Sequence, residues 1–103
     1  MAEAAREVEL FRSPKGTENA RSIRLTLEPD FSLKMDAQDF GPAVEATFGD
    51  GDYEFWYLLK PGSTKSLLVE LIRDRFGGRD NGIGDFGAFL KERGIKTEFG
   101  SWT

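Results

Sequence analysis

The spacing of apolar residues changes once along this chain, and that change constrains the fold more than any other feature. From Ser22 to Glu28, apolar side chains alternate with polar ones, which is typical of a half-buried strand. From Ser63 or Thr64 onward, apolar residues recur every three or four positions, as on one face of an amphipathic helix. Strands followed by helices are typical of an α+β domain.

The alternating region predicts a strand followed by two hairpins. Expected strands cover Glu7–Arg12, Ser22–Glu28, Phe31–Asp36 and the two arms of residues 43–59. The turn pair Pro29-Asp30 joins the two strands of the first hairpin, because proline presets its own φ and aspartate bonds to nearby backbone. In the second hairpin, Val44, Ala46 and Phe48 are expected on one face of the first arm, and Gly49–Asp52 forms the tip.

The helical region predicts two helices. The first is expected over Thr64–Phe76, with Leu67, Leu71 and Ile72 on its apolar stripe and glycines at its end. The second is expected to begin at an N-cap, Asp85, and to end before Gly94. A short strand, Ile95–Phe99, closes the pattern.

Together these elements predict an α+β fold of two layers, with a mainly antiparallel sheet of five to six strands and two helices on one face. A chain of 103 residues has room for one domain, so residues 1–103 are expected to form a single unit with residues 1–6 flexible.

The composition removes several kinds of chemistry. The chain contains neither cysteine nor histidine, which excludes disulfides, thiolate zinc sites, cysteine nucleophiles and imidazole acid–base catalysis. We therefore expect no metal, no cofactor and no enzymatic activity, although a carboxylate pair among Asp50, Asp52 and Glu54 stays open as an acid–base alternative. No apolar run is long enough to span a bilayer, so a cytoplasmic protein without membrane contact is expected.

The charge is concentrated in one segment. The formal net charge is -4, and residues 28–54 hold eight acidic residues but only one basic residue. A nucleic-acid binder needs a basic surface to neutralise phosphates, so nucleic acid is not an expected partner. A basic protein is the expected partner, because opposite potentials steer association.

A candidate docking surface combines this acidity with aromatic residues. Its members are Asp50, Asp52, Tyr53, Glu54 and Trp56. Clustered carboxylates around aromatic anchors are typical of a protein-binding module. The specific function that we expect is that of an immunity or antitoxin-like inhibitor of a basic partner. Alternation places Trp56 and Leu58 on the strand face opposite Tyr53, so either both faces are covered or this patch is exposed. If both faces are covered, the acidic residues are an ordinary solvated surface with no binding role.

Other functions remain open as alternatives. The segment Gly82–Gly87 satisfies G-x-G-x-x-G, but no strand precedes it and Asp85 would repel a phosphate, so nucleotide binding is not expected. Arg79 and Gly84 are weak candidates for holding an anion, which would make the chain a small-ligand or anion-binding domain using the loop Gly77–Gly87. The chain could also be an orphan subunit of a larger assembly. A monomer and a homodimer are both open, because a free sheet edge can pair with its twin.

Overall fold

A computed structural model describes residues 4–49 and 51–102 of the chain. It divides the chain into two compact units, Met1–Ser66 and Leu67–Thr103. The first unit holds the whole sheet, and the second holds most of a pair of helices.

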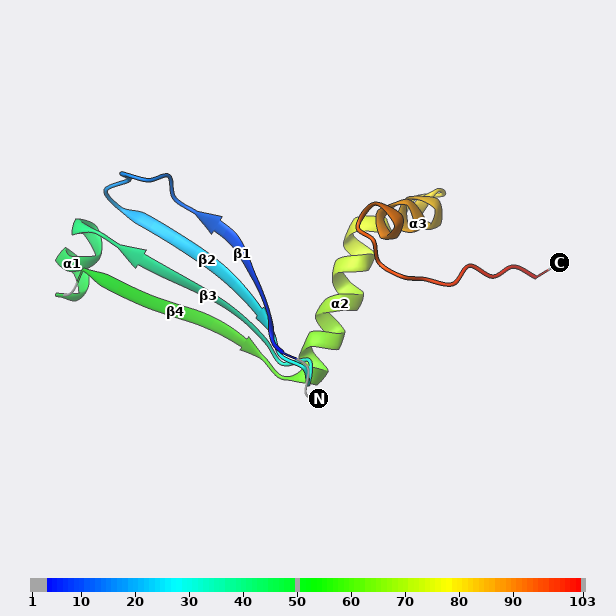
Figure 1. Cartoon of the computed structure of the whole chain (residues 1–103), viewed down its shortest axis with the longest axis horizontal. Helices are drawn as coiled ribbons and strands as arrows, with labels where there is room; N and C mark the ends of the chain where they lie inside the picture. Colours follow the sequence, from blue (N-terminus) through cyan, green and yellow to red (C-terminus); the bar gives the residue numbers. More distant parts are fainter. Residues whose placement is uncertain (1–3, 50, 103) are drawn as a thin grey trace. The chain divides into compact units, whose positions relative to one another are not determined.

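The sheet is a four-stranded antiparallel meander (Figure 1). Its strands are β1 (Arg6–Arg12), β2 (Ala20–Leu27), β3 (Leu33–Phe40) and β4 (Asp52–Leu59). Each strand pairs with the next one along the chain, so β1 and β4 are the two edge strands. The pairings of β2 with β3 and of β3 with β4 are unbroken over eight residues, whereas β1 bulges against β2 between Glu9 and Phe11. The antiparallel sheet confirms the predicted α+β class.

The register gives the sheet two chemically different faces. One, here called the apolar face, carries Val8, Ile23, Leu25, Leu27, Leu33, Met35, Ala37, Phe55, Tyr57 and Leu59. The other, here called the polar face, carries Glu7, Glu9, Arg24, Thr26, Lys34, Asp36, Gln38, Asp52, Glu54, Trp56 and Leu58. The most buried residues of the sheet are adjacent in β3, Asp36 and Ala37, with 5% and 7% exposure. The alternation in the sequence predicted this division correctly for β2, β3 and β4.

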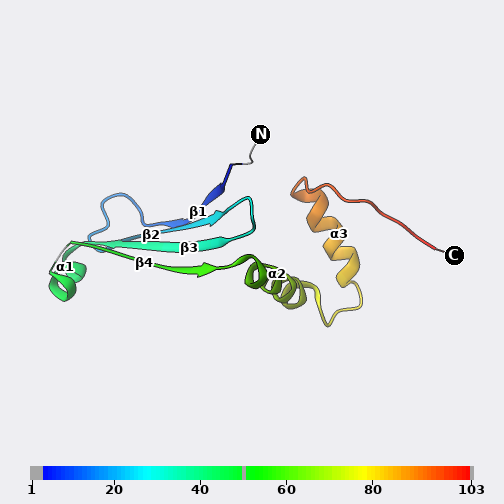
Figure 2. The same cartoon turned by 90° about the horizontal axis from the view of Figure 1, so that it is seen from below.

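The connection between β3 and β4 contains a helix, α1 (Pro42–Phe48), which corrects the prediction of a second hairpin over residues 43–59. Its sequence fits a helix because Pro42 stands in the first turn, where a missing N–H costs nothing, and Gly49 ends it in a left-handed conformation. Just before this helix, Gly41 has φ +123°, and a Cβ there would lie 2.3 Å from the Glu18 carbonyl oxygen. Because residues 42–48 form a helix, the hairpin partner of β4 is β3. Figure 2 shows α1 at one end of the sheet.

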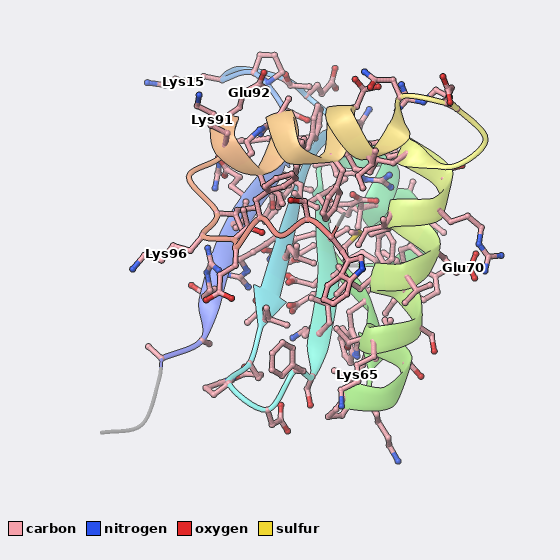
Figure 3. All side chains as sticks on the ribbon, turned by 90° about the vertical axis from the view of Figure 1, so that its right-hand side faces the viewer. Lys15, Lys65, Glu70, Lys91, Glu92 and Lys96 are labelled. Atoms are coloured by element: carbon pink, nitrogen blue, oxygen red, sulfur yellow. The ribbon has the colours of Figure 1, made fainter. Side chains whose placement is uncertain are left out.

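Two further helices follow the sheet, α2 (Pro61–Phe76) and α3 (Gly82–Glu92). The helix α2 ends at the predicted residue but begins three residues earlier than Thr64, since proline is well suited to a first turn. The N-cap of α3 is Asn81, not Asp85, which lies inside the first turn. Phe76 packs edge-on against Phe86 and Phe89, at 5.4 and 5.8 Å between ring centroids. Figure 3 shows Lys65 and Glu70 on α2, and Lys91 and Glu92 at the end of α3.

Among the described residues the chain has four strands and three helices, so five to six strands and two helices was wrong. Ile95–Phe99 forms no strand, because no segment of the described part of the chain pairs with it. The expected flexibility of residues 1–6 falls partly outside the described residues, and Arg6 already belongs to β1. The placement of helices on one sheet face and the single domain stay predictions.

Candidate functional site

A row of four side chains crosses the middle of the polar face, one from each strand. In order from β1 to β4 they are Glu9, Arg24, Asp36 and Trp56. The row exists because residues directly opposite one another in paired strands point to the same face of the sheet, even when they are far apart in the sequence. It places the large aromatic group of β4 beside a buried carboxylate of β3.

Trp56 is the aromatic centre of this face. Its side chain is 56% exposed, and Leu58 beside it is 66% exposed. The Nζ atom of Lys34 lies 5.3 Å from the centroid of the Trp56 ring, within the range of a cation–π contact. The contact orients the indole ring without covering it, so the ring offers apolar area at a charged surface.

Ion pairs and hydrogen bonds order the charges around the ring. Arg24 contacts Asp36 through both carboxylate oxygens, at 3.5 Å from Nε to Oδ1 and 3.4 Å from Nη2 to Oδ2. The hydrogen bond and the charge of Asp36 raise the pKa of the Arg24 guanidinium, to which Glu7 adds a smaller contribution. Gln38 donates from Nε2 to both oxygens of Asp52, at 3.0 and 3.2 Å. Glu54 lies directly opposite Gln38.

A hollow of about 250 Å³ opens on the same face. Its walls include three acidic residues, two basic residues and the apolar side chain of Leu58; the charged residues are Glu7, Glu28, Asp36, Arg24 and Lys34. A pocket of this size has room for one long side chain of a partner, while its acidic walls match the charge of lysine or arginine.

The structure brings together only part of the predicted docking surface. Asp52, Glu54 and Trp56 share the polar face of β4. Tyr53 lies on the apolar face, where its ring stacks on Phe48 at 4.3 Å and on Phe55 at 5.3 Å between centroids. Asp50 lies outside the described residues.

Sequence reasoning missed the residues that complete this surface. The sequence pattern did not connect Lys34 and Arg24 to Trp56. The signal that could have found them was the register of β3 with β4, which places Lys34 opposite Leu58 and Asp36 opposite Trp56.

The candidate anion-binding residues occupy a different place. Arg79 lies in the α2–α3 turn, forms an ion pair with Asp85, and donates from Nη2 to the Arg75 carbonyl oxygen at 2.9 Å. Gly84 lies in the first turn of α3, and a Cβ there would lie 2.5 Å from Asn81 Oδ1. An anion at this turn would compete with Asp85 for the guanidinium, so anion binding stays a weaker prediction.

Within residues 4–49 and 51–102, no group of three or more acidic side chains is arranged to hold a metal ion. None of the helices in this part of the chain has the length and apolar character needed to cross a bilayer. Comparison with protein-family models, with curated proteins and with solved structures finds no match to this chain.

Proposed function

We propose that this chain is a non-enzymatic protein-binding module that docks a basic partner on the polar face of its sheet, in the manner of an immunity or antitoxin-like inhibitor. The observation that carries the proposal is the exposure of Trp56 among the carboxylates of the polar face. Tryptophan is strongly enriched among the residues that dominate binding energy at protein interfaces.

The surrounding charges support a basic partner. Glu9, Glu54 and Asp52 are exposed on the polar face, where they attract a positive surface before contact. The hollow next to Leu58 offers a place for one basic side chain of the partner. The cation–π contact of Lys34 holds the anchor ring in position, which reduces the entropy lost on binding.

The same exposure argues against catalysis by carboxylates. An acid–base pair needs one carboxyl group desolvated enough to hold a proton near neutral pH. Asp52 and Glu54 are both exposed to solvent, and Asp52 accepts hydrogen bonds from Gln38. These features favour a binding role over the acid–base alternative.

One observation favours the alternative of a subunit within a larger assembly. Within Met1–Ser66, the sheet leaves several apolar-face side chains largely exposed, among them Val8 at 49%, Met35 at 41% and Tyr57 at 75%. Exposed apolar patches of this kind often mark contacts with other proteins.

The test compares two neighbouring aromatic residues on opposite faces of β4. Tagged wild-type chain, Trp56→Ala and Tyr57→Ala are used to capture proteins from an extract of the source cell at low and at high salt. We expect wild type and Tyr57→Ala to retain one basic protein at low salt, and Trp56→Ala to lose it. Retention of the same protein by Trp56→Ala, or capture that is insensitive to salt, contradicts the proposal.

A further inference from the structure

The two edges of the sheet differ in how well they are protected against pairing. Exposed edges are usually blocked by charges, prolines or bulges, because their free N–H and C=O groups otherwise pair with another strand. The β1 edge has such protection: charged Arg6, Glu7, Glu9 and Arg12 lie along it, and a bulge interrupts its pairing.

The β4 edge is less protected, because its only charged residues, Asp52 and Glu54, lie at one end. Its eight residues contain no proline and no basic residue, and they pair with β3 without a bulge. Six of them are apolar or aromatic: Tyr53, Phe55, Trp56, Tyr57, Leu58 and Leu59. Within the described part of Met1–Ser66, no further strand pairs with this edge.

We propose that β4 pairs in antiparallel fashion with β4 of a second copy of this chain. The two copies are related by a two-fold axis that passes between their Trp56 residues. A two-fold axis perpendicular to the sheet joins polar face to polar face and apolar face to apolar face. In this register Trp56 lies opposite its symmetry mate, Phe55 lies opposite Tyr57, and Tyr53 lies opposite Leu59. The aromatic pairs favour the contact.

Charge complementarity is satisfied in this register, as it is in one centred on Tyr57, where Glu54 would face Lys60; the register about Trp56 is the one that also brings the two tryptophans together. Lys60 directly follows β4, and continued alternation places it on the polar face. Pairing about Trp56 sets Asp52 of each copy opposite Lys60 of the other, which gives two complementary pairs at the ends of the interface. A register shifted to centre on Phe55 separates Asp52 from Lys60, and so loses both complementary pairs. Parallel pairing would place the acidic residues of both copies side by side, which is unfavourable.

The inference goes beyond the proposed function and does not depend on it. A pair of copies would form one sheet of eight strands with a continuous polar face and two neighbouring tryptophans. Hydrogen bonds from Gln38 already hold the Asp52 carboxylate in place, which leaves its oxygens free to accept further bonds from Lys60.

The first test uses the absence of cysteine in the native chain. Side chains directly opposite across an antiparallel pair have Cβ atoms about 4.5–5.5 Å apart, close enough for a disulfide after a small shift. We expect full-length Trp56→Cys to form a disulfide-linked dimer under mild oxidation at micromolar concentration. Leu58→Cys is the matched control, because the two copies of that position would be four residues out of register, about 13 Å apart.

The outcomes separate the proposal from its rivals. Cross-linking of Trp56→Cys without cross-linking of Leu58→Cys supports the proposed register. Cross-linking of Phe55→Cys alone shows a different register and overturns it. Equal cross-linking of all variants indicates random collision and overturns the proposal. Light scattering on the wild-type chain is a separate check. If the chain stays monomeric at every concentration, the edge is covered in some other way, and the proposal is again overturned.

A charge-swap cycle tests the ends of the interface without touching Trp56. Asp52→Lys and Lys60→Asp should each weaken dimerisation by about threefold to tenfold, because each change places two like-charged pairs in the interface. The double variant should restore wild-type dimerisation. Circular dichroism checks that Asp52→Lys, which loses the hydrogen bonds from Gln38, still folds. A double variant no stronger than the single ones overturns the register.

Discussion

Phe31 adopts a backbone conformation that phenylalanine rarely occupies. Its φ is +73°, in the turn between β2 and β3, where its N–H donates to the Glu28 carbonyl oxygen at 2.9 Å. Asp30 stabilises the same turn by accepting a hydrogen bond from the Ser32 N–H at 2.8 Å. The turn is therefore held by hydrogen bonds that compensate for a strained residue.

Two substitutions at Phe31 isolate this strain. Phe31→Ala and Phe31→Gly both remove the ring, but only glycine removes the Cβ atom that disfavours positive φ. We expect Phe31→Gly to have a free energy of unfolding about 1 kcal/mol higher than Phe31→Ala, measured by urea denaturation. Equal stability of the two variants would show that the turn relaxes when the ring is lost.

Acid sensitivity is a second residue-scale property. Arg21 donates from Nε and Nη2 to the two oxygens of Asp39, at 2.6 and 2.7 Å, and these bonds hold the pKa of Asp39 below its usual range. A carboxyl group whose folded pKa is lowered stabilises the fold above its unfolded pKa. That stability is lost as the pH falls through the folded pKa, which places the loss below about pH 5.

We expect Arg21→Gln to reduce this part of the acid dependence. The wild-type chain should lose stability more steeply than the variant between pH 5 and pH 2, as measured by urea unfolding at each pH. Some slope should remain in the variant, because the Ser32 N–H also lowers the pKa of Asp30. Identical slopes would mean that the Arg21–Asp39 pair does not persist in solution.

At the scale of elements, the strands were more predictable than their pairing. Alternation identifies the two faces of a strand from its own residues, so the faces of β2 and β4 followed directly. The neighbours across strands depend on which strands pair. Because residues 43–48 were taken as the partner of β4, the position of Asp36 opposite Trp56 was missed.

The helix α1 was missed because its pattern fits two periods. Val44, Ala46 and Phe48 alternate as in a strand, but Val44 and Phe48 also lie four residues apart, on one side of a helix. Pro42 was the distinguishing signal, since proline is common in the first turn of a helix and rare inside a sheet.

The identity of a partner could not be predicted at all, because that information lies in another molecule.

The turn between α2 and α3 gives an element-scale prediction. A Cβ at Gly82 would lie 2.1 Å from the Phe76 carbonyl oxygen, whereas a Cβ at Gly87 meets nothing within 4 Å. We expect Gly82→Ala to separate the two helices and lower the melting temperature. Gly87→Ala should instead stabilise α3 by about 0.5–1 kcal/mol. Thermal unfolding followed by circular dichroism measures both, and a harmless Gly82→Ala would contradict the close approach.

At the scale of the whole molecule, charge placement should matter more than net charge. Once a partner has been captured, we expect Glu54→Lys to slow its association by about threefold to tenfold at low salt and to weaken the salt dependence. Glu70→Lys changes the net charge equally but lies on α2 (Figure 3), so it should have little effect. Stopped-flow or surface-plasmon measurements give both rates. Equal effects of the two variants would mean that the polar face of β4 is not the docking surface.

The order of the strands also has a consequence for synthesis. Because every strand of the meander pairs with the strand next to it in sequence, only short chain segments must close to complete the sheet. All four strands precede α3 in the chain, so their residues are translated before those of α3. No strand therefore needs residues beyond Leu59 to find its pairing partner, so formation of the sheet does not depend on completion of α3.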